Sequence, residues 1–146
     1  MKIKPLKILI AQEDPATRWL YQRLLQEDGY QVFTVDSGFQ ALNLITEKAF
    51  DLLVLDLNLE DMDLLEILPL IRLKQPSLPV VVVASSYHLH LDEIKEGDLD
   101  AQMIVSQPLT FLKLRKAVHN ILGKGLVTPQ SIQNNPSFNP SFFSKN

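Results

Sequence analysis

Short apolar blocks separated by longer amphipathic segments dominate the first three quarters of the chain. Four of these blocks hold only apolar residues: 8–11, 52–55, 80–83 and 103–105. They are too short for helices and show no alternation with polar residues, which is typical of strands in a parallel sheet covered on both faces. A fifth block, residues 30–35, includes Gln31 and Thr34 and fits a strand at the edge of the sheet.

Between the blocks, apolar residues recur at helical spacing. The first such segment begins at Asp14 and Pro15, an N-cap residue followed by proline, and ends at Gly29. Its apolar positions are Trp19, Leu20, Leu24 and Leu25. The segment therefore predicts an amphipathic helix between the first two strands.

Four more helices are predicted further along the chain. Ser37 can cap the second, the third ends before Pro76, a weaker fourth covers residues 89–96, and the fifth runs from a Thr110 cap to Gly123. The third carries an apolar stripe that we interpret as core packing rather than as part of a cofactor site: Leu64, Leu65, Leu68 and Ile71.

Strand followed by helix, five times over, predicts a parallel sheet covered by helices on both sides. Right-handed crossovers leave few topologies, and the flavodoxin-like strand order 2-1-3-4-5 is the commonest with five strands. We therefore predict an α/β fold, a flavodoxin-like (βα)5 domain over residues 1–122. Residues 123–146 then form a polar tail, in which Asn-Pro-Ser-Phe at 135–138 is repeated at 139–142. This tail is either a solvated low-complexity end or a short motif whose phenylalanines anchor in a partner's groove.

Composition narrows the class of protein. The 146 residues include 14 basic and 17 acidic side chains, and the net charge of −3 argues against direct binding to nucleic acid or to a membrane surface. The absence of cysteine excludes disulfides, thiolate metal sites and cysteine nucleophiles. No apolar run approaches the ~20 residues of a bilayer span, and no apolar segment follows the basic first residues as in a signal peptide. We expect a soluble, cytoplasmic, single domain.

Polar side chains follow the first and third predicted strands. Gln12, Glu13 and Asp14 come after the first, and Asp56 comes after the third. In open parallel sheets, ligands bind beyond the carboxyl ends of the strands, where the strand order reverses. Glu13 and Asp56 therefore converge, and two carboxylates so close repel unless a cation lies between them. A hard, oxygen-seeking ion such as Mg²⁺ is the natural occupant.

The sequence around these residues resembles the receiver domain of two-component response regulators. Residues 7–15, Lys-Ile-Leu-Ile-Ala-Gln-Glu-Asp-Pro, are similar to the opening of that family. The similarity continues through residues 51–58, 61–63 and 78–83 and ends with Pro108 ahead of the last helix. It covers about residues 6–122. The resemblance implies a (βα)5 fold in which an aspartate accepts a phosphoryl group from a histidine kinase, with Mg²⁺ bound.

Carried over to this chain, the resemblance places the phosphoacceptor at Asp56. It implies that Asn58 supplies a backbone carbonyl to the metal, and that Glu13 is the remaining member of the acidic pair after the first strand. Gln12 replaces the other member, which removes one negative charge from the metal site. We expect a weakened Mg²⁺ site of Glu13, Asp56 and Asn58, because Mg²⁺ demands near-octahedral geometry and Glu13 is one methylene longer than aspartate.

Other departures fall on groups that would contact the phosphoryl group. Gln107 replaces a lysine and supplies no positive charge, a loss of ~4 kcal/mol for a unit pair at about 4 Å and an effective dielectric constant of 20. Ala84 lacks the usual hydroxyl, for which Ser86 is the better substitute because strand alternation points its side chain the same way. Ile104 stands where an aromatic residue usually moves with that hydroxyl.

Two departures lie in the loop after the phosphoacceptor. Glu60 replaces the usual proline and Leu64 the usual glycine. A side chain at position 64 changes the path of the loop if the family's glycine has a positive φ there.

Our leading hypothesis is a stand-alone, divergent receiver domain that acts as a signalling interaction module. A histidine kinase or phosphotransfer protein is the expected donor. The resemblance implies that a downstream effector binds the face formed by residues 89–96, 103–105 and 110–122; a homodimer is left open. We favour impaired phosphorylation at Asp56 over a fully competent receiver, because the lysine, hydroxyl and aromatic positions are all replaced.

Two alternatives from other classes use the same topology. A phosphohydrolase would carry Asp-x-Asp after the first strand, whereas Asp56-Leu57-Asn58 follows the third. A flavin-binding protein would need a phosphate loop rich in serine, threonine or glycine after the first strand, and the acidic residues there repel phosphate. We therefore expect no enzyme activity.

Overall fold

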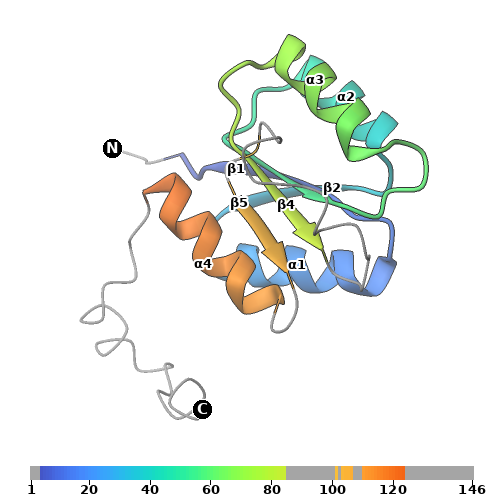
Figure 1. Ribbon diagram of the computed structural model, residues 1–146. Helices are drawn as coiled ribbons and strands as arrows, with labels where there is room; N and C mark the ends of the chain where they lie inside the picture. The colour runs from blue at the N-terminus through green and yellow to red at the C-terminus, as the bar shows by residue number, and fades with distance from the viewer. Residues whose placement is uncertain (1–3, 85–100, 102, 107–109, 124–146) are drawn as a thin grey trace, which may run out of the picture.

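The computed structural model describes residues 4–84, 101, 103–106 and 110–123. Within them, strands and helices follow one another in the predicted order (Figure 1): β1 Lys7–Ala11, α1 Pro15–Glu27, β2 Gln31–Val35, α2 Gly38–Glu47, β3 Leu52–Asp56, α3 Leu64–Lys74, β4 Val80–Ala84, β5 Met103–Ser106 and α4 Thr110–Leu122. The predicted helix over residues 89–96 and the tail 123–146, Gly123 excepted, lie outside the described residues.

The strands form one parallel sheet in the order β2-β1-β3-β4-β5, which confirms the predicted flavodoxin-like topology. β1 lies between β2 and β3, and its residue Ala11 is opposite Val35 on one side and Leu55 on the other. β3 in turn pairs with β4, where Asp56 is opposite Val83. The carboxyl ends of β1, β3 and β4 therefore meet at one edge of the sheet.

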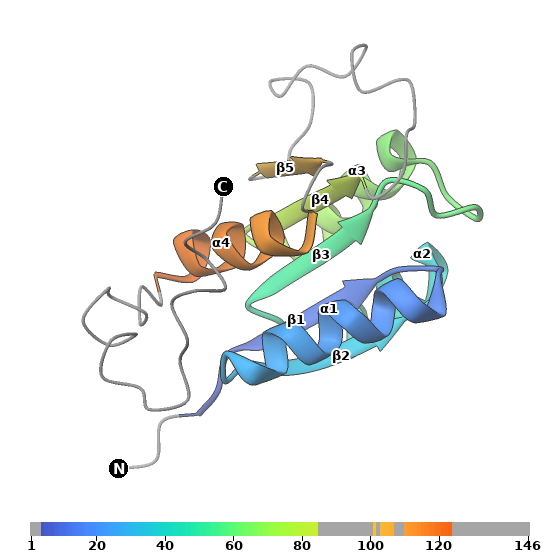
Figure 2. The same cartoon turned by 90° about the horizontal axis from the view of Figure 1, so that it is seen from below.

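Helices cover both faces of the sheet, α2 and α3 on one and α1 and α4 on the other (Figures 1 and 2). Successive strand residues point to opposite faces, so Leu9 packs under α2 and α3 whereas Ile8 and Ile10 pack under α1 and α4. Every residue of β3 and β4 is buried, which explains why these strands are continuous apolar runs rather than alternating ones.

Local signals fix the helix ends as predicted. Asp14 caps α1 by accepting from Thr17 N, and Ser37 caps α2 by accepting from Gln40 N. Gly29 and Gly123 end their helices with φ of 93° and 65°, where glycine meets no steric cost. Thr110 is the first residue of α4 rather than the residue before it, a shift of one position that helix ends commonly show.

Three of the apolar positions named for the predicted helices are exposed instead of packed. On α1, Tyr21 and Leu25 face the sheet, whereas Trp19 and Leu20 are 58% and 54% exposed. On α3, the predicted stripe is wrong at Leu65, which is 59% exposed. The helical turn explains the difference, because a residue next to one that faces the core is rotated about 100° away from it.

No helix among the residues that the structure describes is long and apolar enough to cross a membrane.

Candidate functional site

The candidate site lies at the carboxyl ends of the parallel strands, where β1 and β3 end side by side. We call this end of the sheet its carboxyl edge. Asp56 is the last residue of β3, and Gln12 follows β1 directly. Because Ala11 is opposite Leu55 in the parallel register, the next residues, Gln12 and Asp56, also face each other. Both are only 4% exposed, and they are the buried polar residues of the described core. The edge therefore brings the predicted phosphoacceptor position into contact with the residue that replaces an acid.

Neutral donors among the described residues contact both oxygens of the Asp56 carboxylate. Gln12 Nε2 donates to Asp56 Oδ2, and Asn58 N donates to Asp56 Oδ1 at 2.7 Å. Both donors are neutral, so they stabilise the ionised carboxylate without cancelling its charge. An acidic residue at position 12 would instead place a second negative charge against Asp56.

A hydrogen bond to the side-chain oxygen of Gln12 sets the orientation of its amide. Its Oε1 accepts from Asp14 N at 3.0 Å, which leaves Nε2 pointing at Asp56. Arg18 closes the same loop from α1, because its guanidinium donates to the Gln12 carbonyl at 2.9 Å and to the Glu13 carbonyl at 3.2 Å. The positive charge of Arg18 is thus directed at backbone carbonyls of the β1–α1 loop.

Glu13 contacts the loop that follows Asp56. Its Oε1 accepts from Glu60 N at 3.4 Å, a long hydrogen bond on an exposed side chain. Glu13 therefore reaches across from the β1–α1 loop to the β3–α3 loop, four residues beyond Asp56. Asp14 next to it is occupied with capping: hydrogen bonds from the Thr17 hydroxyl and then from its backbone N–H lower the pKa of Asp14.

Tyr21 lies beneath the site on α1 and senses the same carboxylate. Burial raises the pKa of the Tyr21 hydroxyl, and the negative charge of Asp56 raises it further. Its phenol thus stays neutral at ordinary pH. Sequence patterns gave no reason to select Tyr21 or Arg18, since the first is placed by the packing of α1 on the sheet and the second by a local contact with the β1–α1 loop.

The β3–α3 loop takes a course that accommodates Leu64. This residue is the first of α3, and its side chain is buried in the core under α2 and α3. Asp61, which sequence analysis did not single out, accepts from Gly38 N and Phe39 N, each at 2.9 Å. The loop is therefore anchored to the start of α2.

The remaining predicted positions divide between described and undescribed residues. Ala84 is buried at the end of β4, and Ile104 lies in β5 opposite Val82. Ser86 and Gln107 lie outside the described residues.

The oxygen donors available here suit a hard cation. Glu13 and Asp56 offer two carboxylates and Asn58 a backbone carbonyl, the kinds of ligand that Mg²⁺ prefers. Within the described part of the chain, no three histidine, cysteine, aspartate or glutamate side chains gather closely enough to hold a metal by themselves. A metal bound here would thus depend on backbone oxygen and water as well as on the two carboxylates.

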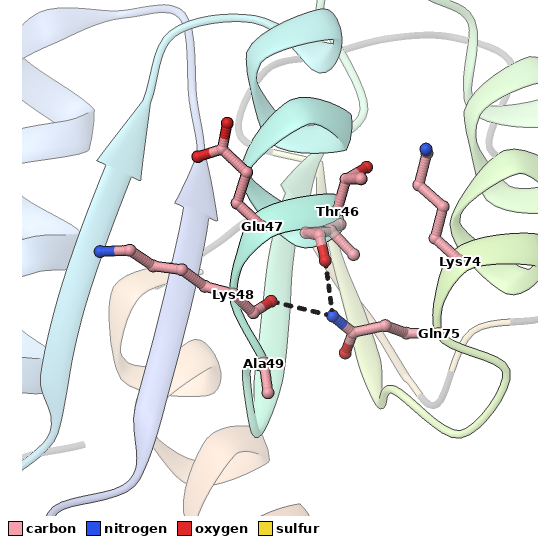
Figure 3. A pocket seen from close by; sticks show the side chains of 7 residues that line it. Thr46, Glu47, Lys48, Ala49, Lys74 and Gln75 are labelled. Atoms are coloured by element: carbon pink, nitrogen blue, oxygen red, sulfur yellow. Dashed lines mark hydrogen bonds between the residues drawn. The ribbon is translucent and has the colours of Figure 1, made fainter.

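A separate hollow of about 460 Å³ lies at the opposite edge of the sheet, where α2 and α3 end (Figure 3). Gln75 Nε2 spans it by donating to the Ile45 carbonyl at 2.9 Å and the Lys48 carbonyl at 3.0 Å. These bonds satisfy carbonyls at the end of α2, so we interpret the hollow as part of a helix end and not of the candidate site.

Comparison with known proteins identifies the family. A profile of the response regulator receiver domain matches residues 8–119. Sporulation initiation phosphotransferase F of Bacillus subtilis is 31% identical over 117 residues, which are 80% of this chain and 93% of that protein. The transcriptional regulatory protein ZraR of Klebsiella oxytoca is also 31% identical, over 89% of this chain, but the match spans only 29% of its length.

A solved structure shows the same fold. The receiver domain of a sensor histidine kinase from Pseudomonas aeruginosa, with a magnesium ion coordinated in its active-site cleft, superposes with a TM-score of 0.72. The match has 19% identity and covers 82% of this chain and 99% of the other. The fold and the match along residues 8–119 agree, and this chain belongs to the family of response regulator receiver domains, the receiver modules of two-component signalling.

Proposed function

We propose that this receiver domain works as an interaction module in which phosphoryl transfer to Asp56 is impaired. The hydrogen bond from Gln12 to Asp56 carries the proposal. It places a neutral amide against the carboxylate at the position where the family has an acid, so that a divalent cation at this edge is held by less negative charge. The bond also occupies one of the two oxygens that would attack phosphorus.

Phosphoryl transfer to Asp56 would need little covalent chemistry from the rest of the protein. An Asp56 oxygen would form a bond to phosphorus while the bond from phosphorus to the donor's histidine nitrogen breaks, and the imidazole leaves with the electron pair. When bound, Mg²⁺ would neutralise charge on the phosphoryl oxygens. Glu13, Asp56 and the Asn58 carbonyl would hold it.

Neutral groups stand where charged or switching groups would act on the product. Gln107 and Ser86 would donate hydrogen bonds to the phosphoryl oxygens, and Ala84 offers none. Without a cation at position 107, the developing charge is stabilised less, because charge-assisted hydrogen bonds are roughly twice as strong as neutral ones. A fully competent receiver at Asp56 is the alternative, and the oxygen ligands at the edge favour it.

Partners follow from this role. A histidine kinase or a phosphotransfer protein would approach the edge that holds Asp56, in the cytoplasm. A downstream effector would bind the predicted face of residues 89–96, β5 and α4; on α4, Phe111 is 47% exposed. An exposed aromatic on a helix is the kind of anchor that protein interfaces favour. A second copy of the chain could occupy the same face.

The test is incubation of the full chain with Mg²⁺ and a small phosphodonor, followed by intact-mass measurement. We expect only a minor phosphorylated fraction, absent from Asp56→Asn. Rapid, stoichiometric phosphorylation that Asp56→Asn abolishes would overturn impairment in favour of the competent alternative.

A further inference from the structure

Asp61 joins the loop after Asp56 to the start of helix α2. Its two carboxylate oxygens accept from two successive backbone amides, Gly38 N and Phe39 N, both at 2.9 Å. These contacts link residues 22 and 23 positions apart in sequence. Asp61 thus connects the loop that follows the predicted phosphoacceptor to the start of α2, the helix that precedes β3.

The start of α2 is well suited to hold this carboxylate. The first amides of a helix have no partner within it, and the helix dipole favours a negative charge there. Ser37 takes the amide of Gln40, and Asp61 takes the two before it. α2 has no acidic residue in its own first turn, so Asp61 supplies the charge from another segment.

The junction is also tightly packed. A Cβ at Gly38 would lie 2.9 Å from Ile67 Cδ1 and 3.3 Å from Met62 Cβ, so only glycine fits without a shift of its neighbours. The backbone of α2 therefore lies directly against the residue that follows Asp61 and against α3. Little room remains for the loop to take another path while this contact holds.

The loop is attached at three places between β3 and α3. Asn58 N donates to Asp56 at 2.7 Å, Glu60 N to Glu13 at 3.4 Å, and Asp61 accepts from α2. Glu60 stands where the family has a proline, which would restrict the backbone covalently. Here the restriction comes from the neighbouring side chain instead.

From this arrangement we infer that Asp61 is a positioning residue of the phosphoacceptor site. It holds the β3–α3 loop so that the Asn58 backbone stays against Asp56 and the Glu60 amide stays against Glu13. Asp61 acts through the loop and touches neither ligand nor reacting atoms. Asp61 thus determines the geometry of the loop, and any effect of Asp61 on Mg²⁺ binding rests on the proposed function.

The experiment compares Asp61→Asn with Asp63→Asn in the full chain. Both remove one negative charge from the same loop, but Asp63 makes no side-chain capping bond to α3 and so is a matched control. Amide hydrogen exchange by NMR reports on Asn58 and Glu60, residues that neither substitution changes. Urea denaturation separates a local effect from a global loss of stability.

We expect Asp61→Asn to speed exchange at Asn58 and Glu60 about tenfold relative to Asp63→Asn, because the substitution weakens the two charge-assisted hydrogen bonds that hold the loop, and a tenfold change corresponds to ~1.4 kcal/mol. Asp61→Ser, which keeps one oxygen acceptor, is the second variant if the first does not fold. Equal exchange at Asn58 in the Asp61 and Asp63 variants would overturn the inference.

Titration with Mg²⁺ alone then separates the two proposals. Weaker Mg²⁺ binding by Asp61→Asn at unchanged global stability supports the positioning role at the metal site. Rapid phosphorylation of the unmodified chain would overturn the proposal of impaired transfer. It would not change the hydrogen-exchange result, so the positioning role of Asp61 would still be supported.

Discussion

Two carboxylates of this domain, Asp28 and Asp56, both have side chains largely hidden from solvent and meet opposite kinds of partner. The Asp28 side chain is 4% exposed, and its two oxygens accept from the Arg115 guanidinium, with His119 Nε2 also 3.0 Å away. Asp56 accepts from a neutral amide and a backbone N–H. Asp28 thus ties the end of α1 to α4 by ion pairing, whereas these two donors to Asp56 carry no charge.

A buried tyrosine lies beside each carboxylate, and the charges around the carboxylate affect the pKa of its hydroxyl. Burial, followed by the charge of Asp28, raises the pKa of Tyr30 to about 12, and the positive charge of Arg115 works against that rise. Burial and the charge of Asp56 also raise the pKa of Tyr21. At Tyr30 a neighbouring cation thus opposes the effect of the carboxylate, and we expect the different partners of Asp28 and Asp56 to affect stability differently as well.

The largest expected effect is on Asp28. Asp28→Asn leaves the Arg115 guanidinium without its charged partner, and we expect unfolding free energy to fall by about 3 kcal/mol, in the range for breaking a buried ion pair. Urea denaturation measures the loss. Glu27→Gln is the matched control, because Glu27 is exposed and its pair with Arg23 spans 3.9 Å. That pair contributes at most about 1 kcal/mol. Equal losses of unfolding free energy in the two variants would contradict a special contribution of the Asp28 ion pair.

Alkaline pH should produce the next largest effect. The folded-state pKa of Tyr30 is about 12 against an ordinary 10, so between those values the unfolded chain loses a proton that the folded chain keeps. Ionisation therefore favours unfolding: stability is fully present below about pH 10 and falls by roughly 2 kcal/mol as pH rises toward 12. Tyr30→Phe should remove this part of the fall in a denaturation series and leave the part that comes from Tyr21, whose pKa is also raised; an unchanged slope would contradict it.

The fold could be predicted from the sequence further than the site could. Strands such as residues 52–55 and 80–83 are continuous apolar runs because both their faces are buried, and this periodicity can be seen without coordinates. The side of a helix is harder to assign where apolar residues are adjacent. Leu64 and Leu65 are alike in sequence, yet one is buried and the other is 59% exposed.

The site depends on contacts that residue types alone do not specify. Gln12 could be recognised as a missing acid, but that its amide donates to Asp56 follows from the rotamer that Asp14 N imposes. Asp61 belongs to an acidic stretch with no pattern of its own, and its partners lie on a helix more than twenty residues away. Tertiary proximity decides the partners of Asp61, whereas a short contact within the β1–α1 loop orients Gln12 toward Asp56.

Replacing Gln12 by an acid tests the comparison by adding a negative charge next to Asp56. Gln12→Asp sets a second negative charge against Asp56, so we expect lower stability without metal and about tenfold tighter Mg²⁺ binding, or ~1.4 kcal/mol. Denaturation with and without Mg²⁺ measures both. Asn43→Asp adds the same charge on an exposed face of α2 and should show neither effect. Tighter binding in both variants would indicate a nonspecific response to charge.

The smallest effect is expected where the charge of Asp56 itself is removed. In Asp56→Asn the new amide can still accept from Asn58 N, but it can accept from Gln12 Nε2 only if its own N–H group points elsewhere. If the Gln12 amide turns over to accept instead, it gives up its bond from Asp14 N, so one neutral hydrogen bond is lost by either route. That loss amounts to about 1 kcal/mol in urea denaturation, well below the expected loss for Asp28→Asn. A loss as large as that of Asp28→Asn would mean that Asp56 is ion-paired like Asp28, and the distinction between the two carboxylates would fail.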